Sequence, residues 1–323
     1  MTKVVDNKSE KKYYPEIDVI KGFTILVVIC AHCINSNTML PELPNRILHV
    51  FSMPLFMMAS GFLFSLKDDW HTFLRKKTLR LLVPYLSFGL ITIAIRSLAG
   101  SISRGEVTLM RALGGLFIGD YYWFLYALFI IMIICKLLKS TWAIVLYGVM
   151  SFVCSYYIED KNIPFILNRL IVYPFYFIFG YLIKSHYEKL YNVIQSHFLI
   201  FCIVSTFLFV FTVENDLNGF LYLDTLHLSR ITGCFMVAIW SMLIAFKAPS
   251  LLYAILKHFG KYSLQYYLNH LCLYLSFVSL ILFHLTKNAV ITLLLVFLIR
   301  VIGSWMMLQI EKKYNILRIM SGL

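Results

Sequence analysis

The stretch IDVIKGFTILVVICAHC, residues 17–33, decides the fold of this chain, because it is apolar enough to cross a lipid bilayer. It nevertheless contains Lys21 and His32 within the apolar run. A charged side chain near the centre of a bilayer costs at least about 2.5 kcal/mol on insertion scales, so such residues are candidates for function. The stretch therefore predicts a membrane helix that carries candidate functional groups.

The whole chain has the composition of a protein dissolved in lipid. Its 323 residues are 60% hydrophobic and 14% charged, with a mean hydropathy of +0.78, whereas soluble domains carry about 25% charged residues. We expect an all-α, polytopic membrane protein with about ten transmembrane helices. The predicted spans are 17–35, 46–66, 81–99, 122–138, 141–157, 166–185, 197–213, 229–247, 262–283 and 288–310.

The distribution of positive charge predicts the orientation of these spans. With the N-terminus inside, 19 of the 29 lysines and arginines fall in cytoplasmic segments and 5 in outer loops. Both termini are therefore expected in the cytoplasm, and residues 1–323 form a single transmembrane domain with a cytoplasmic leader (1–16) and tail (311–323). The leader is polar and predicts no cleaved signal peptide. The net charge of +13 is explained by the cationic cytoplasmic loops that orient the protein in the membrane. No motif predicts nucleic acid as a partner.

The seven cysteines are scattered through apolar runs and predict neither a disulfide framework nor a metal centre. The tetrad CAHC, residues 30–33, contains potential ligands, but a haem-attachment motif would place the histidine last. Buried cysteines behave as small hydrophobic residues. We therefore expect no metal.

Lys21 and His32 share one face of the first predicted helix. Eleven residues of α-helix leave a net rotation of only about 20° and span about 16 Å. Lys21 lies near the cytoplasmic surface and His32 lies deep in the span. This arrangement suits a long anionic ligand that enters from the cytoplasm, with the imidazole as a base. A structural histidine bonded to a neighbouring helix is the alternative.

Two further segments carry candidate functional residues. In HTFLRKKTLRLLVPY, residues 71–85, Lys77 and Arg80 are three apart and share a helical face, which suits a phosphate clamp or ordinary cytoplasmic charge. In HFGKYSLQYYLNH, residues 258–270, His270 and Asn269 lie inside a predicted span. Such groups serve catalysis or bond across helices.

Among the arginines on predicted spans, three are considered for function. Arg169 and Arg230 lie near the outer ends of their spans, where the side chains either reach the interface or bind a ligand. Arg300 lies in the middle of its span, and the sequence does not reveal its partner.

Three segments resemble the acyltransferase-3 family of integral membrane acyltransferases, especially those that O-acetylate bacterial cell-surface glycans. These segments are EIDVIKGFTILVVICAH, FSMPLFMMASGFLF and FGKYSLQYYLNH. Weaker matches are RKKTLRLLVPY, YYWFL and YPFYFIFGYLI, and the ordered set spans almost the whole chain. Lys21 occupies a position where arginine is common in the family. Lys77 and Arg80 occupy the positions of the family's pair of arginines. The chain resembles a stand-alone member without an extracytoplasmic domain.

The resemblance implies acetyl-CoA, or another acyl-CoA such as a succinyl donor, and a sugar hydroxyl of a cell-surface polysaccharide or its lipid-linked precursor as acceptor. It implies a multi-pass protein of the bacterial cytoplasmic membrane, surrounded by lipid. A transporter or flippase for a glycan or lipid intermediate is the alternative, although no internal repeat supports it.

The resemblance also implies roles for particular residues. His32 would deprotonate the acceptor or briefly carry the acyl group, and His270 and Asn269 would bind the acceptor or stabilise the oxyanion. The expected donor site consists of Lys21, Lys77, Arg80 and Ser60. The expected acceptor site consists of Tyr122, Trp123, Arg169 and Arg230, although the aromatic residues equally suit a membrane-interface belt.

Overall fold

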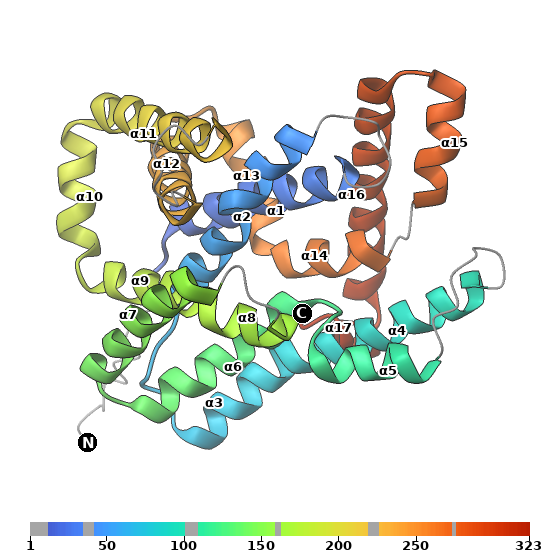
Figure 1. The fold of residues 1–323 in the computed structure, drawn as a ribbon, viewed down its shortest axis with the longest axis horizontal. Coiled ribbons are helices and arrows are strands. Elements are labelled where there is room, and N and C mark those ends of the chain that lie inside the picture. The colour runs from blue at the N-terminus through green and yellow to red at the C-terminus, as the bar shows by residue number, and fades with distance from the viewer. Residues whose placement is uncertain (1–11, 35–41, 101–108, 159–162, 219–225, 273–275) are drawn as a thin grey trace, which may run out of the picture.

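A computed structural model gives the fold of the chain (Figure 1). It describes residues 12–34, 42–100, 109–158, 163–218, 226–272 and 276–323, and every regular element in these ranges is a helix. The helices are α1 (Pro15–Ile34), α2 (Glu42–Phe62), α3 (Trp70–Lys77), the π-helical turn η1 (Thr78–Leu82), α4 (Val83–Gly100), α5 (Leu109–Ile118), α6 (Trp123–Leu138), α7 (Thr141–Ile158), α8 (Phe165–Val172), α9 (Pro174–Ser185), α10 (Tyr187–Ser196), α11 (Phe198–Asn218), α12 (Leu226–Lys247), α13 (Ser250–Lys261), α14 (Ser263–Cys272), α15 (Ser276–Thr286), α16 (Ala289–Lys313) and α17 (Asn315–Met320).

Within the described residues, seven helices are long and apolar enough to cross a membrane, judged by length and composition. They are Pro15–Ile34, Trp70–Ile95, Ala112–Leu138, Phe165–Ser185, Phe198–Asn215, Leu228–Lys247 and Ala289–Lys313. The shorter apolar helices Ile47–Phe62 and Thr141–Tyr157 coincide with two more predicted spans. The chain is thus an all-α polytopic membrane protein, while the number of crossings and the side of each terminus stay predictions.

The predicted span at 262–283 includes residues that lie outside the described part of the chain, so the span as a whole stays a prediction. On either side of them the structure describes α14, which ends at Cys272, and α15, which begins at Ser276. In α14, Gln265, Asn269 and His270 are all buried, so this helix places polar side chains inside the protein. The helix α15 runs beside α16 (Figure 1).

Two helix pairs are in direct backbone contact through glycines. A Cβ atom on Gly61 of α2 would lie 1.8 Å from the carbonyl oxygen of Phe177 in α9, and one on Gly180 of α9 would lie 1.9 Å from that of Met58. The helices α1 and α13 are also in direct backbone contact, at Gly22 of α1 and Gly260 of α13. Small residues allow membrane helices to approach this closely.

The first helix occupies the centre of the molecule. It packs against α2, α12, α13, α14 and α16, and Figure 1 shows it between α2 and α16 with α14 crossing beside it. Val19, Ile25 and Ile29 are fully buried in these contacts. Because α1 touches helices from both halves of the chain, its polar side chains meet partners that are far away in the sequence.

Candidate active site

Three histidines from three helices converge at the end of α1. The ring centroid of His32, in the last turn of α1, lies 5.2 Å from that of His270 in α14. It lies 5.8 Å from the ring centroid of His49, near the start of α2. The structure thus brings together the two predicted catalytic histidines and adds a third that the sequence analysis did not select.

One ring nitrogen of His270 is fixed by its own helix. Nδ1 lies 2.9 Å from the carbonyl oxygen of Tyr266, one turn earlier. A carbonyl only accepts, so Nδ1 carries the hydrogen and donates it. In a neutral ring the lone pair is then on Nε2. This atom is buried and has no hydrogen-bond partner among the described residues, and the residue is only 1% exposed. His270 therefore has a basic nitrogen available inside the protein.

Arg300 supplies a permanent positive charge to the same region. It is 6% exposed in the middle of α16, and its charge acts on the imidazoles of both His32 and His270. The charge of Arg300 is thus felt by the imidazoles, and the thiol of Cys33 also interacts with it electrostatically. A guanidinium here can stabilise negative charge that develops on a reacting oxygen.

Asn269, the residue before His270, lines a cavity. The residue is fully buried, and Glu311 lines the same cavity. The cavity measures about 170 Å³ and is lined by Phe88, Ile91, Ile95, Asn269, Met307, Glu311, Leu317 and Met320. Its wall is almost entirely apolar. The predicted role of Asn269 at an oxyanion stays a prediction.

The predicted donor residues are spread over three helices and a turn. Lys21 shares α1 with His32, as the spacing requires, and forms an ion pair with Asp18 at 3.0 Å. Lys77 is the last residue of α3 and is half-buried, whereas Arg80 is exposed on η1. Since η1 is wider than an α-helical turn, the three-residue spacing does not give the α-helical alignment of these two cations. Ser60 is half-buried in α2.

Two of the predicted acceptor residues are in contact. The guanidinium carbon of Arg169 lies 4.9 Å from the ring centroid of Trp123, 4.6 Å from that of Phe165 and 5.8 Å from that of Tyr173. Cations bind favourably to aromatic faces at such distances. The three rings and the arginine form a mixed apolar and cationic surface, which suits a sugar with an acidic substituent.

The other two predicted acceptor residues lie elsewhere. Tyr122 is only 4% exposed, and its hydroxyl lies 3.1 Å from that of Thr92 and donates to the carbonyl of Leu268 at 3.2 Å. It therefore ties α4 and α6 to α14, next to His270. Arg230 is half-buried in the first turns of α12, where it interacts with other groups. Acceptor binding by either residue stays a prediction.

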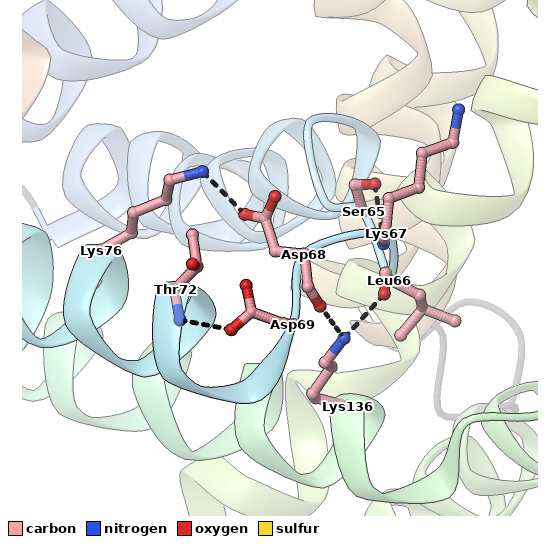
Figure 2. Close-up of polar contacts among 8 residues, drawn as sticks. All are labelled: Ser65, Leu66, Lys67, Asp68, Asp69, Thr72, Lys76 and Lys136. Atoms are coloured by element: carbon pink, nitrogen blue, oxygen red, sulfur yellow. Dashed lines mark hydrogen bonds and ion pairs between the residues drawn. The ribbon is translucent and has the colours of Figure 1, made fainter.

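A buried lysine fixes the loop that leads into the basic helix α3 (Figure 2). Nζ of Lys136 donates to the carbonyl oxygens of Leu66 at 2.7 Å and Asp68 at 2.5 Å, and the residue is 8% exposed. Lys184 donates to the carbonyl of Phe64 at 3.1 Å. Both lysines are among the 19 basic residues that the sequence places in cytoplasmic segments. In the structure they hold the loop that precedes the predicted phosphate clamp.

The N-terminus of α3 is capped within the same loop. The carboxylate of Asp69 accepts from the backbone N–H of Thr72 at 3.0 Å, and these hydrogen bonds hold the pKa of Asp69 below its usual value. Lys76 pairs with Asp68 at 3.1 Å on the outside of the turn. Together these contacts set the direction in which α3 leaves α2.

Replacing Lys136 with methionine should loosen this loop. The change leaves the carbonyl groups of Leu66 and Asp68 without their charged donor, which costs about 1–3 kcal/mol. We expect faster amide exchange over 63–72 and a lower melting temperature in detergent. The matched control is Lys67→Met, because the Lys67 side chain is exposed and points away from the loop in Figure 2. Equal exchange in the two variants would show that Lys136 does not hold the loop.

Among the described residues, no three His, Cys, Asp or Glu side chains lie close enough together to hold a metal ion. The imidazoles of the histidine cluster are suited to proton transfer, and the guanidinium of Arg300 is suited to charge stabilisation.

The fold and this site define an integral membrane protein whose helices enclose three imidazoles and a guanidinium. The family model described as "Acyltransferase domain" matches residues 14–309, which is most of the chain. The chain therefore belongs to the acyltransferase-3 family and is a membrane acyltransferase. No curated protein matches it. No solved structure matches it either.

Proposed function

We propose that the chain transfers an acetyl group from cytoplasmic acetyl-CoA to a sugar hydroxyl of a cell-surface polysaccharide or its lipid-linked precursor, in the bacterial cytoplasmic membrane. The observation that carries the proposal is the contact between the half-buried His32 and the buried His270, in the field of Arg300. Membership of the acyltransferase family supplies the reaction class. O-acetylation and the two substrates are inferred from the resemblance and from the chemistry that the site can perform.

The proposed reaction is a direct transfer. The sugar hydroxyl gives its proton to an imidazole nitrogen of His32 while its oxygen attacks the thioester carbonyl. Arg300 stabilises the oxyanion of the tetrahedral intermediate. The carbon–sulfur bond then breaks, and the imidazolium returns the proton to the departing thiolate. His270, held by Tyr266, orients the reacting groups through its buried Nε2.

The remaining residues are proposed to bind the two substrates on either side of this centre. Lys21, Lys77 and Arg80 face the phosphates of the donor, and Ser60 shapes its site. Trp123 and Arg169 contact the acceptor sugar, because a ring and a guanidinium suit its apolar face and an acidic substituent.

The ester content of the host's surface glycan tests this function. Deleting the gene should remove base-labile acetyl groups, and the native protein should restore them. His32→Ala at matched membrane abundance should restore less than about a tenth, since His32 is the proposed base and acid–base residues contribute about 10²–10⁴-fold. If deletion leaves the esters unchanged and glycan export falls, the protein is a transporter and the proposal is wrong.

A further inference from the structure

Three basic side chains gather around one tyrosine between α13 and α14. The ammonium group of Lys312, near the end of α16, lies 4.0 Å from the ring centroid of Tyr262. That of Lys261, at the end of α13, lies 5.3 Å from the same centroid. The ring of His258 lies 5.2 Å from that of Tyr262. Helices that are about fifty residues apart in the sequence thus bring positive charge to one place.

No carboxylate balances this charge in the described part of the chain, because no ion pair joins Lys261, Lys312 or His258 to an acidic residue there. Burial, followed by the positive charges of Lys312 and Lys261, lowers the pKa of His258. Like charges held this close repel one another. An arrangement of this kind is stable when an anion binds between the cations.

We infer that Lys261, Lys312 and His258 form a phosphate-binding site that holds the acyl-CoA donor. Ammonium groups are good point-charge partners for phosphate, and the imidazole of His258 offers a ring N–H as a further donor. This inference rests on the function proposed above, since it assigns a binding site to the donor of that reaction. The inferred site consists of residues outside the basic segment that contains Lys77 and Arg80 and resembles the family.

The position of the cluster suits a donor with a long arm. Tyr262 immediately precedes α14, and His270 follows eight residues later, about 12 Å along the helix. In acyl-CoA the phosphates and the thioester lie at opposite ends of the pantetheine arm, so one molecule can occupy the cluster and reach the histidines. A small anion alone cannot span this separation.

The cluster also adjoins the helix that carries Lys21 and His32. A Cβ atom on Gly260 would lie 1.8 Å from the carbonyl oxygen of Asp18, so α13 touches α1 one turn from Lys21. The new cations and the predicted donor lysine therefore belong to one region of the protein. A second source of phosphate in this region is the headgroup of an anionic lipid, and the experiment must separate the two.

The test compares donors with and without phosphates on the purified full-length protein in nanodiscs. The variants are Lys312→Gln and Lys261→Gln, and the matched control is Lys313→Gln, because Lys313 is the neighbouring cation and lies over a different ring, that of Tyr314. KM and kcat are measured with acetyl-CoA and with acetyl-pantetheine, which carries no phosphate. Each measurement is made in nanodiscs of phosphatidylcholine alone and with phosphatidylglycerol added.

Each cluster variant should raise KM for acetyl-CoA about tenfold with kcat unchanged, as expected from the loss of one charge-assisted contact. The KM for acetyl-pantetheine should be the same in the variants, the control and the native protein. If the variants raise both KM values equally, or raise neither, the donor does not bind at the cluster. An effect that occurs only with phosphatidylglycerol would assign the site to lipid and overturn the inference.

If the proposed function itself is wrong, the native protein neither binds acetyl-CoA in a titration without acceptor nor releases CoA from it. If only the inferred site is wrong, the native protein uses acetyl-CoA normally and the cluster variants behave like Lys313→Gln.

Discussion

Replacing His32 with glutamine should lower kcat for acyl transfer by about 10²–10⁴-fold, because glutamine keeps the approximate size of the side chain and removes its basic nitrogen. The KM for the donor should change little, since the proposed role of His32 is at the attacking hydroxyl and not at the phosphates of the donor. The measurement is CoA release and base-labile product at saturating donor, with the protein in nanodiscs. The rings of His32 and His270 lie only 5.2 Å apart, so folding is checked by thermal unfolding.

The control for this variant is His284→Gln. His284 is exposed on α15 and belongs to neither the histidine cluster nor the basic cluster around Tyr262. It should retain native kcat and native stability. A folded His32→Gln protein that keeps more than a tenth of the native kcat would exclude His32 as the base and leave Nε2 of His270 as the alternative.

Replacing Gly180 with alanine should lower stability by about 1–3 kcal/mol, although the change adds a single methyl group. That methyl would lie 1.9 Å from the carbonyl oxygen of Met58, and the atom it meets belongs to the backbone of α2. Neither helix can avoid the contact by rotating a side chain, so α2 and α9 must separate. The measurement is the melting temperature in detergent, together with the elution profile of the purified protein.

Gly114→Ala is the matched control for this prediction. It makes the same chemical change in α5, and no atom lies within 4 Å of the added methyl. Alanine favours a helix over glycine by about 0.5–1 kcal/mol, so this variant should be as stable as the native protein or slightly more stable. Equal melting temperatures for the two variants would show that the contact between α2 and α9 tolerates a side chain.

The fold class could be predicted from the sequence because it depends on properties of single segments. The long apolar runs predict helices, and the all-α polytopic architecture is confirmed. The span predicted at 262–283 stays a prediction as a whole, because part of it lies outside the described residues. Apolarity alone does not show that Gln265, Asn269 and His270 on α14 are buried inside the protein.

The candidate site could be predicted only in part. The shared face of Lys21 and His32 follows from the geometry of one helix, and both lie in α1. The contact with His270 depends on packing between distant helices, which no spacing encodes. His49 was missed, although a hairpin of the first two helices places the end of one beside the start of the next. That geometry could have identified it.

Lys136 shows why counting charges is not enough. A positive-inside count treats every lysine near a helix end as solvated, and this assumption predicts orientation well. It carries no information about backbone carbonyl groups that need a donor. The ammonium group of Lys136 is buried on the carbonyls of Leu66 and Asp68, which lie about seventy residues earlier in the chain.

The glycine contacts also determine how substrates can enter. His32 is on α1 and His49 is on α2, and each of these helices rests directly on the backbone of a second helix, α13 or α9. Helices in such contact cannot slide past each other without a clash. We therefore expect α1, α2, α9 and α13 to act as a fixed frame, and any gating for the proposed substrates to arise from α14, α15 and α16.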